Sequence, residues 1–181
     1  APESKRLCYV GQNSKASGKI AGELLGKFLN GRGKVAILTG FAEAWGQKQR
    51  IEGFQHEIKN YFPEIEVVDI SRPFEYYNNE QNAYNIAKRI IHEIPDLTGI
   101  YVTSTVGTIG VGRALRDLNF IGRIKLVGYD ITDEIRDMLI DGTIQATISQ
   151  DPYAQGYYPI KILFNYLTQE IKHSSDSAYT K

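Results

Sequence analysis

The fold is decided by residues 99–130, which read GIYVTSTVGTIGVGRALRDLNFIGRIKLVGYD. Two largely apolar runs, 99–103 and 125–129, have the length and composition of strands that are buried on both faces. Between them, residues 108–118 repeat apolar side chains with the period of a helix. A strand, a helix and a second strand in this order predict two parallel strands joined by a right-handed crossover.

The same alternation continues on both sides of this unit. We expect further strands at residues 7–10, 35–39, 65–70 and 145–148. Helical periodicity predicts helices at residues 17–30, 46–61, 79–93, 133–141 and 153–168. The sequence therefore predicts a three-layer α/β/α protein with a Rossmann-like parallel sheet. Residues 172–181 lack an apolar period, and we expect a flexible tail there.

The composition restricts the classes of function. Twenty-one basic and twenty-one acidic side chains balance, so this chain lacks the positive field that binding to nucleic acid phosphates needs. No apolar run approaches the roughly 20 residues that span a bilayer. Cys8 is the sole cysteine, which favours a reducing compartment, and we expect it buried in the first strand. The start at Ala1, without Met, suggests a chain cut from a longer protein.

Polar side chains gather where the predicted strands end. In an open parallel sheet, ligands bind at the carboxyl ends of the strands, so the loops that begin there form the candidate site. Most of these loops offer amide, hydroxyl or aromatic groups, together with one acid and one guanidinium, a set that suits a polyol. The candidate ligand contacts are Asn13, Trp45, Arg50, Tyr77, Ser104, Asp130 and Gln150.

Four separated motifs follow one another along the chain: SGKIAGELL at 17–25, RIEGF at 50–54, VGYD at 127–130 and ISQ at 148–150. Together they resemble the type I periplasmic binding proteins and the sensor domains of the lactose/galactose-repressor family, over residues 7–168. The resemblance implies that residues 1–171 form the carboxy-terminal lobe of a two-lobed domain. It also implies crossing strands near 7–13 and 145–151, and a sugar held in a cleft that closes between the lobes.

The resemblance also implies roles for individual residues. Arg50 matches the arginine of the family motif Arg-x-x-Gly-Phe, which donates to sugar hydroxyls or to the ring oxygen. Asp130 matches the family acid whose carboxylate accepts two hydroxyl hydrogens. Asn13 matches a family position before the first helix, and Gln150 matches one on the return crossing.

One pair of residues differs from the family pattern, and two aromatic candidates lie beside the family motifs. Ser104 and Thr105 stand where the family usually has Asn-Asp, so the identity of the ligand cannot be carried over from any member. Trp45 and Tyr77 lie in loops at the ligand end, where aromatic rings stack on the apolar C–H faces of sugars. We expect Trp45 to be the better stacking candidate.

Each polar candidate also has a structural alternative. Arg50 can pair with a glutamate of its own helix, and Asp130 can cap the helix that begins near residue 133. Asn13 can cap a helix or form an Asx turn, and Gln150 can make a hinge hydrogen bond without a ligand in reach. These alternatives leave the predicted fold unchanged.

The expected function is the sugar-binding effector domain of a cytoplasmic transcription regulator resembling the lactose repressor. Such a protein is a homodimer and would contact DNA only through a headpiece outside this chain. The alternative is an extracytoplasmic sugar-binding protein of a transporter or a sensor kinase. An α/β enzyme is the least favoured class, because the loops present no nucleophile with a base and an orienting acid.

We expect no cofactor, metal site or membrane contact. The glycines at 107, 110 and 112 depart from the dinucleotide-binding spacing, and the three histidines lack a metal-ligand spacing.

Overall fold

The computed structural model describes residues 7–69 and 73–168 of the 181-residue chain. The chain divides into two compact units. The larger unit, Ser14–Ser149, contains the sheet and the first five helices described. The described residues 7–13 and 150–168 belong to the other unit, which contains the helix α6, Pro152–Leu167.

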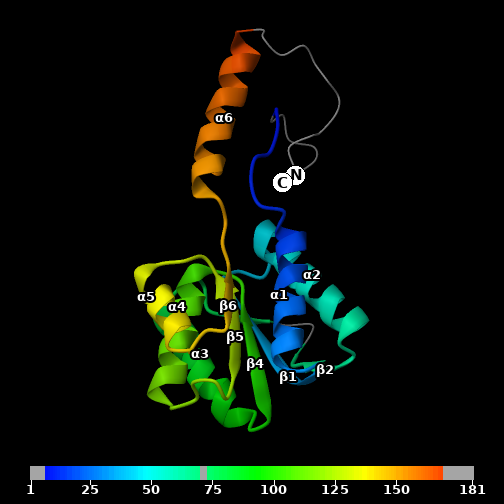
Figure 1. Ribbon diagram of the computed structural model, residues 1–181, viewed down its shortest axis with the longest axis vertical. Coiled ribbons are helices and arrows are strands. Elements are labelled where there is room, and N and C mark those ends of the chain that lie inside the picture. Colours follow the sequence, from blue (N-terminus) through cyan, green and yellow to red (C-terminus); the bar gives the residue numbers. More distant parts are fainter. Residues whose placement is uncertain (1–6, 70–72, 169–181) are drawn as a thin grey trace. The chain divides into compact units, whose positions relative to one another are not determined.

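A parallel sheet lies at the centre of the larger unit (Figure 1). Its strand order is β2-β1-β4-β5-β6, and β3 pairs with the end of β1. All strand pairings among the described residues are parallel, so the strands end at one common edge. The strands are β1 (Arg32–Thr39), β2 (Glu64–Val67), β3 (Phe74–Glu75), β4 (Leu97–Val102), β5 (Lys125–Tyr129) and β6 (Ala146–Ile148).

Helices cover both faces of this sheet. One face carries two of them and the opposite face three (Figure 1). The first pair is α1 (Ser14–Phe28) and α2 (Trp45–Tyr61). The opposite layer is α3 (Glu80–Glu93), α4 (Thr105–Asp117) and α5 (Asp133–Ile140). The predicted α/β/α class is thereby confirmed, and each predicted helix is present within a few residues of its expected bounds.

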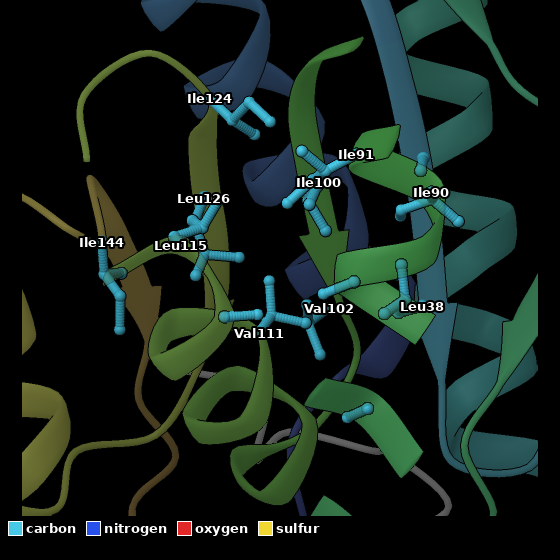
Figure 2. Packing of buried hydrophobic residues seen from close by; sticks show 14 of the residues in the cluster. Leu38, Ile90, Ile91, Ile100, Val102, Val111, Leu115, Ile124, Leu126 and Ile144 are labelled. Atoms are coloured by element: carbon cyan, nitrogen blue, oxygen red, sulfur yellow. The ribbon is translucent and has the colours of Figure 1, made fainter. Parts of the chain in front are cut away.

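The central strands are largely apolar along their buried stretches, because both of their faces are covered there. On β1, Val35 and Ile37 face the layer of α1 and α2, whereas Ala36 and Leu38 face the layer of α3 and α4. Figure 2 shows the second of these clusters, in which Leu38 and its strand neighbours meet the α3 and α4 side chains. At about 25 cal/mol per Å² of apolar surface, this double burial is the main stabilising contribution to the unit.

Glycines let α1 and α2 approach one another at backbone distance. A Cβ atom at Gly53 would lie 2.1 Å from the carbonyl oxygen of Lys15, so only glycine fits there. One residue later, the Phe54 ring stacks on Tyr101 of β4, with centroids 4.3 Å apart and planes 8° from parallel. The glycine and the phenylalanine of the RIEGF stretch therefore hold α2 against a helix and against the sheet.

Three local expectations differ from the structure. Residues 7–10 form no strand, because a strand needs a neighbour for its backbone hydrogen bonds and the described residues provide none there. Cys8 is consequently exposed rather than buried. The strand β3 was not predicted, since two residues are too few for a period. The predicted tail at 172–181 and the last residue of the strand expected at 65–70 lie outside the described residues.

Candidate functional site

The guanidinium and the carboxylate of the candidate site are both anchored at the end of β4. Arg50 is half-buried on α2, and its Nη1 donates a 2.6 Å hydrogen bond to the carbonyl oxygen of Thr103. Asp130 follows β5, and its Oδ2 accepts a hydrogen bond from the Thr105 hydroxyl. Thr103 directly follows β4, and Thr105 is the first residue of α4. The structure thus ties Arg50 and Asp130 to one point of the sheet edge, from two sides.

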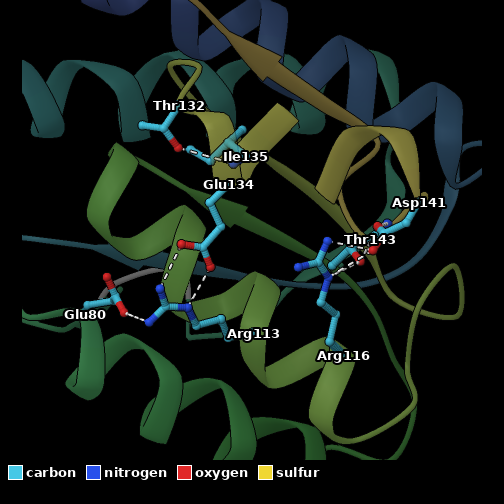
Figure 3. A network of polar contacts seen from close by, with 8 residues as sticks. All are labelled: Glu80, Arg113, Arg116, Thr132, Glu134, Ile135, Asp141 and Thr143. Atoms are coloured by element: carbon cyan, nitrogen blue, oxygen red, sulfur yellow. Dashed lines mark hydrogen bonds and ion pairs between the residues drawn. The ribbon is translucent and has the colours of Figure 1, made fainter. Parts of the chain in front are cut away.

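The backbone at Asp130 is left-handed. Its φ is 62°, which aspartate tolerates better than most residues, and its N–H donates to the carbonyl oxygen of Ile148 at 3.0 Å. The capping alternative for Asp130 is wrong. The Thr132 hydroxyl accepts from the N–H of Ile135 at 3.2 Å and caps α5 in its place (Figure 3).

Ser104 is held by a buried tyrosine. Its Oγ lies 2.6 Å from the hydroxyl oxygen of Tyr76, which is fully buried. Burial raises the pKa of the Tyr76 hydroxyl, so this phenol stays neutral. Although Ser104 precedes α4, its side chain makes no capping hydrogen bond. The pair Ser104 and Thr105 therefore supplies two hydroxyls with different protein partners, Tyr76 and Asp130.

The two aromatic candidates have exposed side chains and lie close in sequence to Arg50 and Tyr76. Trp45 begins α2 and is 68% exposed, and Tyr77, between β3 and α3, is 60% exposed. The Tyr77 ring meets Phe41 edge to face, with centroids 6.0 Å apart. Tyr77 also has a left-handed φ of 53°, which is uncommon for an aromatic residue and is frequent at functional loops. Stacking on a sugar stays a prediction for both rings.

Asn13 and Gln150 belong to the other unit of the chain. Asn13 is exposed, and Gln150 is half-buried. The Oε1 atom of Gln150, which precedes α6, accepts a 3.4 Å hydrogen bond from Gln155 in the first turn of that helix. Their roles as ligand contacts stay predictions.

Gln47 is a site residue that the sequence did not indicate. Its side-chain oxygen accepts from the Thr39 hydroxyl at 2.5 Å and from the N–H of Gly40 at 2.6 Å, and it lies 2.9 Å from the Thr103 hydroxyl. One amide on the first turn of α2 therefore joins the ends of β1 and β4. A glutamine in a surface-type position gives no signal of such a role, because its partners come from distant segments.

An ion-pair network links the helices on the opposite layer (Figure 3). Arg113 of α4 donates to Glu134 of α5 at 2.6 and 2.7 Å, and it also pairs with Glu80 at the start of α3. The hydrogen bond from Arg113 lowers the pKa of Glu134. These partly exposed charges line a surface hollow, but they pair with one another, which indicates a structural network.

Other kinds of site find no support among residues 7–69 and 73–168. In that part of the chain, no three His, Cys, Asp or Glu side chains come together as metal ligands. No described helix is both long and apolar enough to cross a membrane.

Ligands of open α/β sheets bind at the carboxyl ends of the strands, and at this edge the structure holds a guanidinium and a carboxylate in place. The sequence matches the family described as "Periplasmic binding protein domain" over residues 1–171, and the chain belongs to this family.

Two solved structures and one curated relative show the same similarity. The glucose-galactose binding protein GanP of Geobacillus stearothermophilus superposes with a TM-score of 0.89 at 29% identity, over 96% of this chain and 60% of that one. A sugar ABC transporter sugar-binding protein of Bacillus halodurans gives a TM-score of 0.88 at 25% identity, over 96% and 58% of the two chains.

The curated relative is the xylose/arabinose-binding protein XylF of Sulfolobus acidocaldarius, 27% identical over 169 residues, or 91% of this chain. The match covers 40% of that relative. The chain thus spans between two fifths and about three fifths of the length of these three proteins.

Proposed function

We propose that this chain is the carboxy-terminal lobe of a two-lobed protein that binds a monosaccharide reversibly outside the cytoplasm and serves a sugar transporter. The observation that carries the proposal is the joint anchoring of Arg50 and Asp130 at the end of β4. A guanidinium donates to hydroxyl and ring oxygens, and a carboxylate accepts hydroxyl hydrogens, so the pair matches the alternating donors and acceptors of a sugar.

In this proposal, the two lobes close around the bound sugar. A sugar that contacts both lobes binds the closed state more tightly than the open one, and only that difference in affinity shifts the equilibrium. Closure also removes water from the hydrogen bonds that Arg50 and Asp130 would make, which strengthens them. Binding and release need no catalytic residue and no cofactor.

The relatives favour transport over gene regulation. Those described above are named as sugar-binding proteins, and one of them is named as part of a sugar ABC transporter. The effector domain of a cytoplasmic regulator, the function first expected from the sequence, uses the same kind of lobe but has no specific observation in its favour.

A thermal-shift screen of pentoses and hexoses tests the proposal on the two-lobed protein that carries this chain. A sugar present at 100 times its dissociation constant should add about 2.7 kcal/mol to the free energy of unfolding. Glycerol at the same concentration is the control for non-specific stabilisation. If no pentose or hexose exceeds the glycerol control, the protein does not bind monosaccharides.

A further inference from the structure

The Arg50 guanidinium lies over one aromatic ring of the sheet. Its Cζ atom is 3.9 Å from the centroid of the Tyr129 ring, well within the range of a cation–π interaction. Tyr129 is the last residue of β5, directly before Asp130, and it is fully buried. The guanidinium is therefore held by a ring at the end of β5 and by the Thr103 carbonyl at the end of β4.

The Tyr129 ring belongs to the buried core of the unit, and its hydroxyl lies between two other hydroxyls. Its hydroxyl oxygen lies 2.9 Å from Ser17 Oγ on α1 and 3.2 Å from the hydroxyl oxygen of Tyr101 on β4. Burial raises the pKa of the Tyr129 and Tyr101 hydroxyls, so the chain of hydroxyls is neutral. Tyr101 in turn stacks on Phe54, one helical turn after Arg50 on α2.

We propose that Tyr129 is a positioning residue, which holds the Arg50 guanidinium in the orientation that receives the sugar. The proposal rests on the proposed function, since it takes Arg50 as a ligand contact. A free arginine side chain loses rotamer entropy when a ligand orders it. A ring that orders the guanidinium beforehand removes part of that cost from the binding step.

The test separates the ring from its hydroxyl. In the two-lobed protein, Tyr129→Phe keeps the ring, and its sugar affinity should stay within about threefold of the starting protein. Trifluorophenylalanine at position 129 keeps the shape but weakens the negative face of the ring, and should lower the affinity by about threefold to thirtyfold. Because this pair differs little in volume, the comparison does not depend on a cavity in the core.

A spectroscopic measurement reports the position of the guanidinium directly. The Arg50 Hε resonance should show a ring-current shift in Tyr129→Phe and lose it in Tyr129→Leu. Phe54→Leu is the matched control, because it removes a different buried ring of the same cluster, the one that stacks on Tyr101. This control should lose stability yet keep the Arg50 resonance and most of the affinity.

The outcomes distinguish this inference from the proposed function. Unchanged affinity with trifluorophenylalanine, or an unchanged Arg50 resonance in Tyr129→Leu, would overturn the role of Tyr129. If the starting protein binds no sugar, the proposed function fails, and the resonance alone then decides whether Tyr129 orients Arg50.

Discussion

Gly18 of α1 lies so close to Arg50 of α2 that an added Cβ atom would come within 2.0 Å of the Arg50 carbonyl oxygen. The backbone of the candidate ligand arginine is therefore set by a neighbouring helix, while its side chain is set by the ends of two strands. A contact this short cannot absorb a methyl group without separating the helices.

Gly18→Ala should lower the free energy of unfolding by roughly 1–3 kcal/mol, because α2 must move away from α1. Urea denaturation measures the change. Gly46→Ala, on the α2 side of the same helix pair, is the matched control, since its Cβ would meet only Ser14 Oγ at an ordinary 3.6 Å. The control should be neutral or slightly stabilising, as alanine favours helix. Equal losses in both variants would mean that the close contact carries no energetic weight.

Asp130→Asn should weaken sugar binding by roughly 1–3 kcal/mol while leaving the stability without ligand almost unchanged. Asparagine tolerates the left-handed backbone at this position, and its amide oxygen can still accept from Thr105. What it removes is the charge that strengthens hydrogen bonds from the sugar hydroxyls. Calorimetric titration of the two-lobed protein measures the difference.

Thr132→Ala should behave in the opposite way. It removes the cap of α5 and should cost about 1 kcal/mol of stability, with no loss of sugar affinity. If Asp130→Asn lost stability and kept its affinity, Asp130 would be a structural residue and not a ligand contact.

The sequence was sufficient for the layers of the fold because each central strand and each helix carries its own signal. The apolar residues of β1 predict a strand buried on both faces, and the structure buries Val35 through Leu38 as expected. The strand expected at 7–10 is absent from the structure. A local sequence pattern predicts an extended segment there, but a strand also needs a neighbouring strand to pair with, and the pattern carries no information about that neighbour.

The candidate site was predictable only in part. The position of Arg50 and Asp130 at strand ends follows from the order of the elements. Their orientation depends on contacts between segments far apart in sequence, such as Tyr129 with Arg50 and Thr105 with Asp130. The hydrophobic periodicity of a segment carries no information about such contacts, so the sequence indicated only that Tyr129 is a buried strand residue.

Arg113→Ala should cost about 1 kcal/mol near pH 7, because the pair with Glu134 is bidentate but largely solvated. The hydrogen bond from Arg113 lowers the pKa of Glu134 below its ordinary 4.5. A carboxyl with a lowered pKa stabilises the folded state fully above its unfolded pKa, and this contribution disappears as the pH falls through the folded pKa. The difference between the two proteins should therefore shrink below about pH 4.

The control for this measurement is Arg136→Ala. Among the ion pairs described, Arg136 pairs only with exposed acids of its own helix. The substitution Arg136→Ala should therefore lower the free energy of unfolding by at most about 0.5 kcal/mol. Denaturant titrations of both variants between pH 3 and pH 7 provide the comparison. A cost of Arg113→Ala that did not change over this range would exclude the ion pair as its cause.

The helix α6 leaves many large apolar side chains exposed. None of its residues is buried, and Ile160 and Leu167 are 72% and 70% exposed. Apolar area of this size costs several kcal/mol in water, at about 25 cal/mol per Å². A chain limited to residues 1–181 should therefore associate through this helix, whereas a chain ending at Asp151 should be a monomer. Light scattering distinguishes the two, and Phe164→Glu should dissociate the longer chain without changing its circular dichroism. If the longer chain is monomeric at the same concentrations, the surface does not drive self-association.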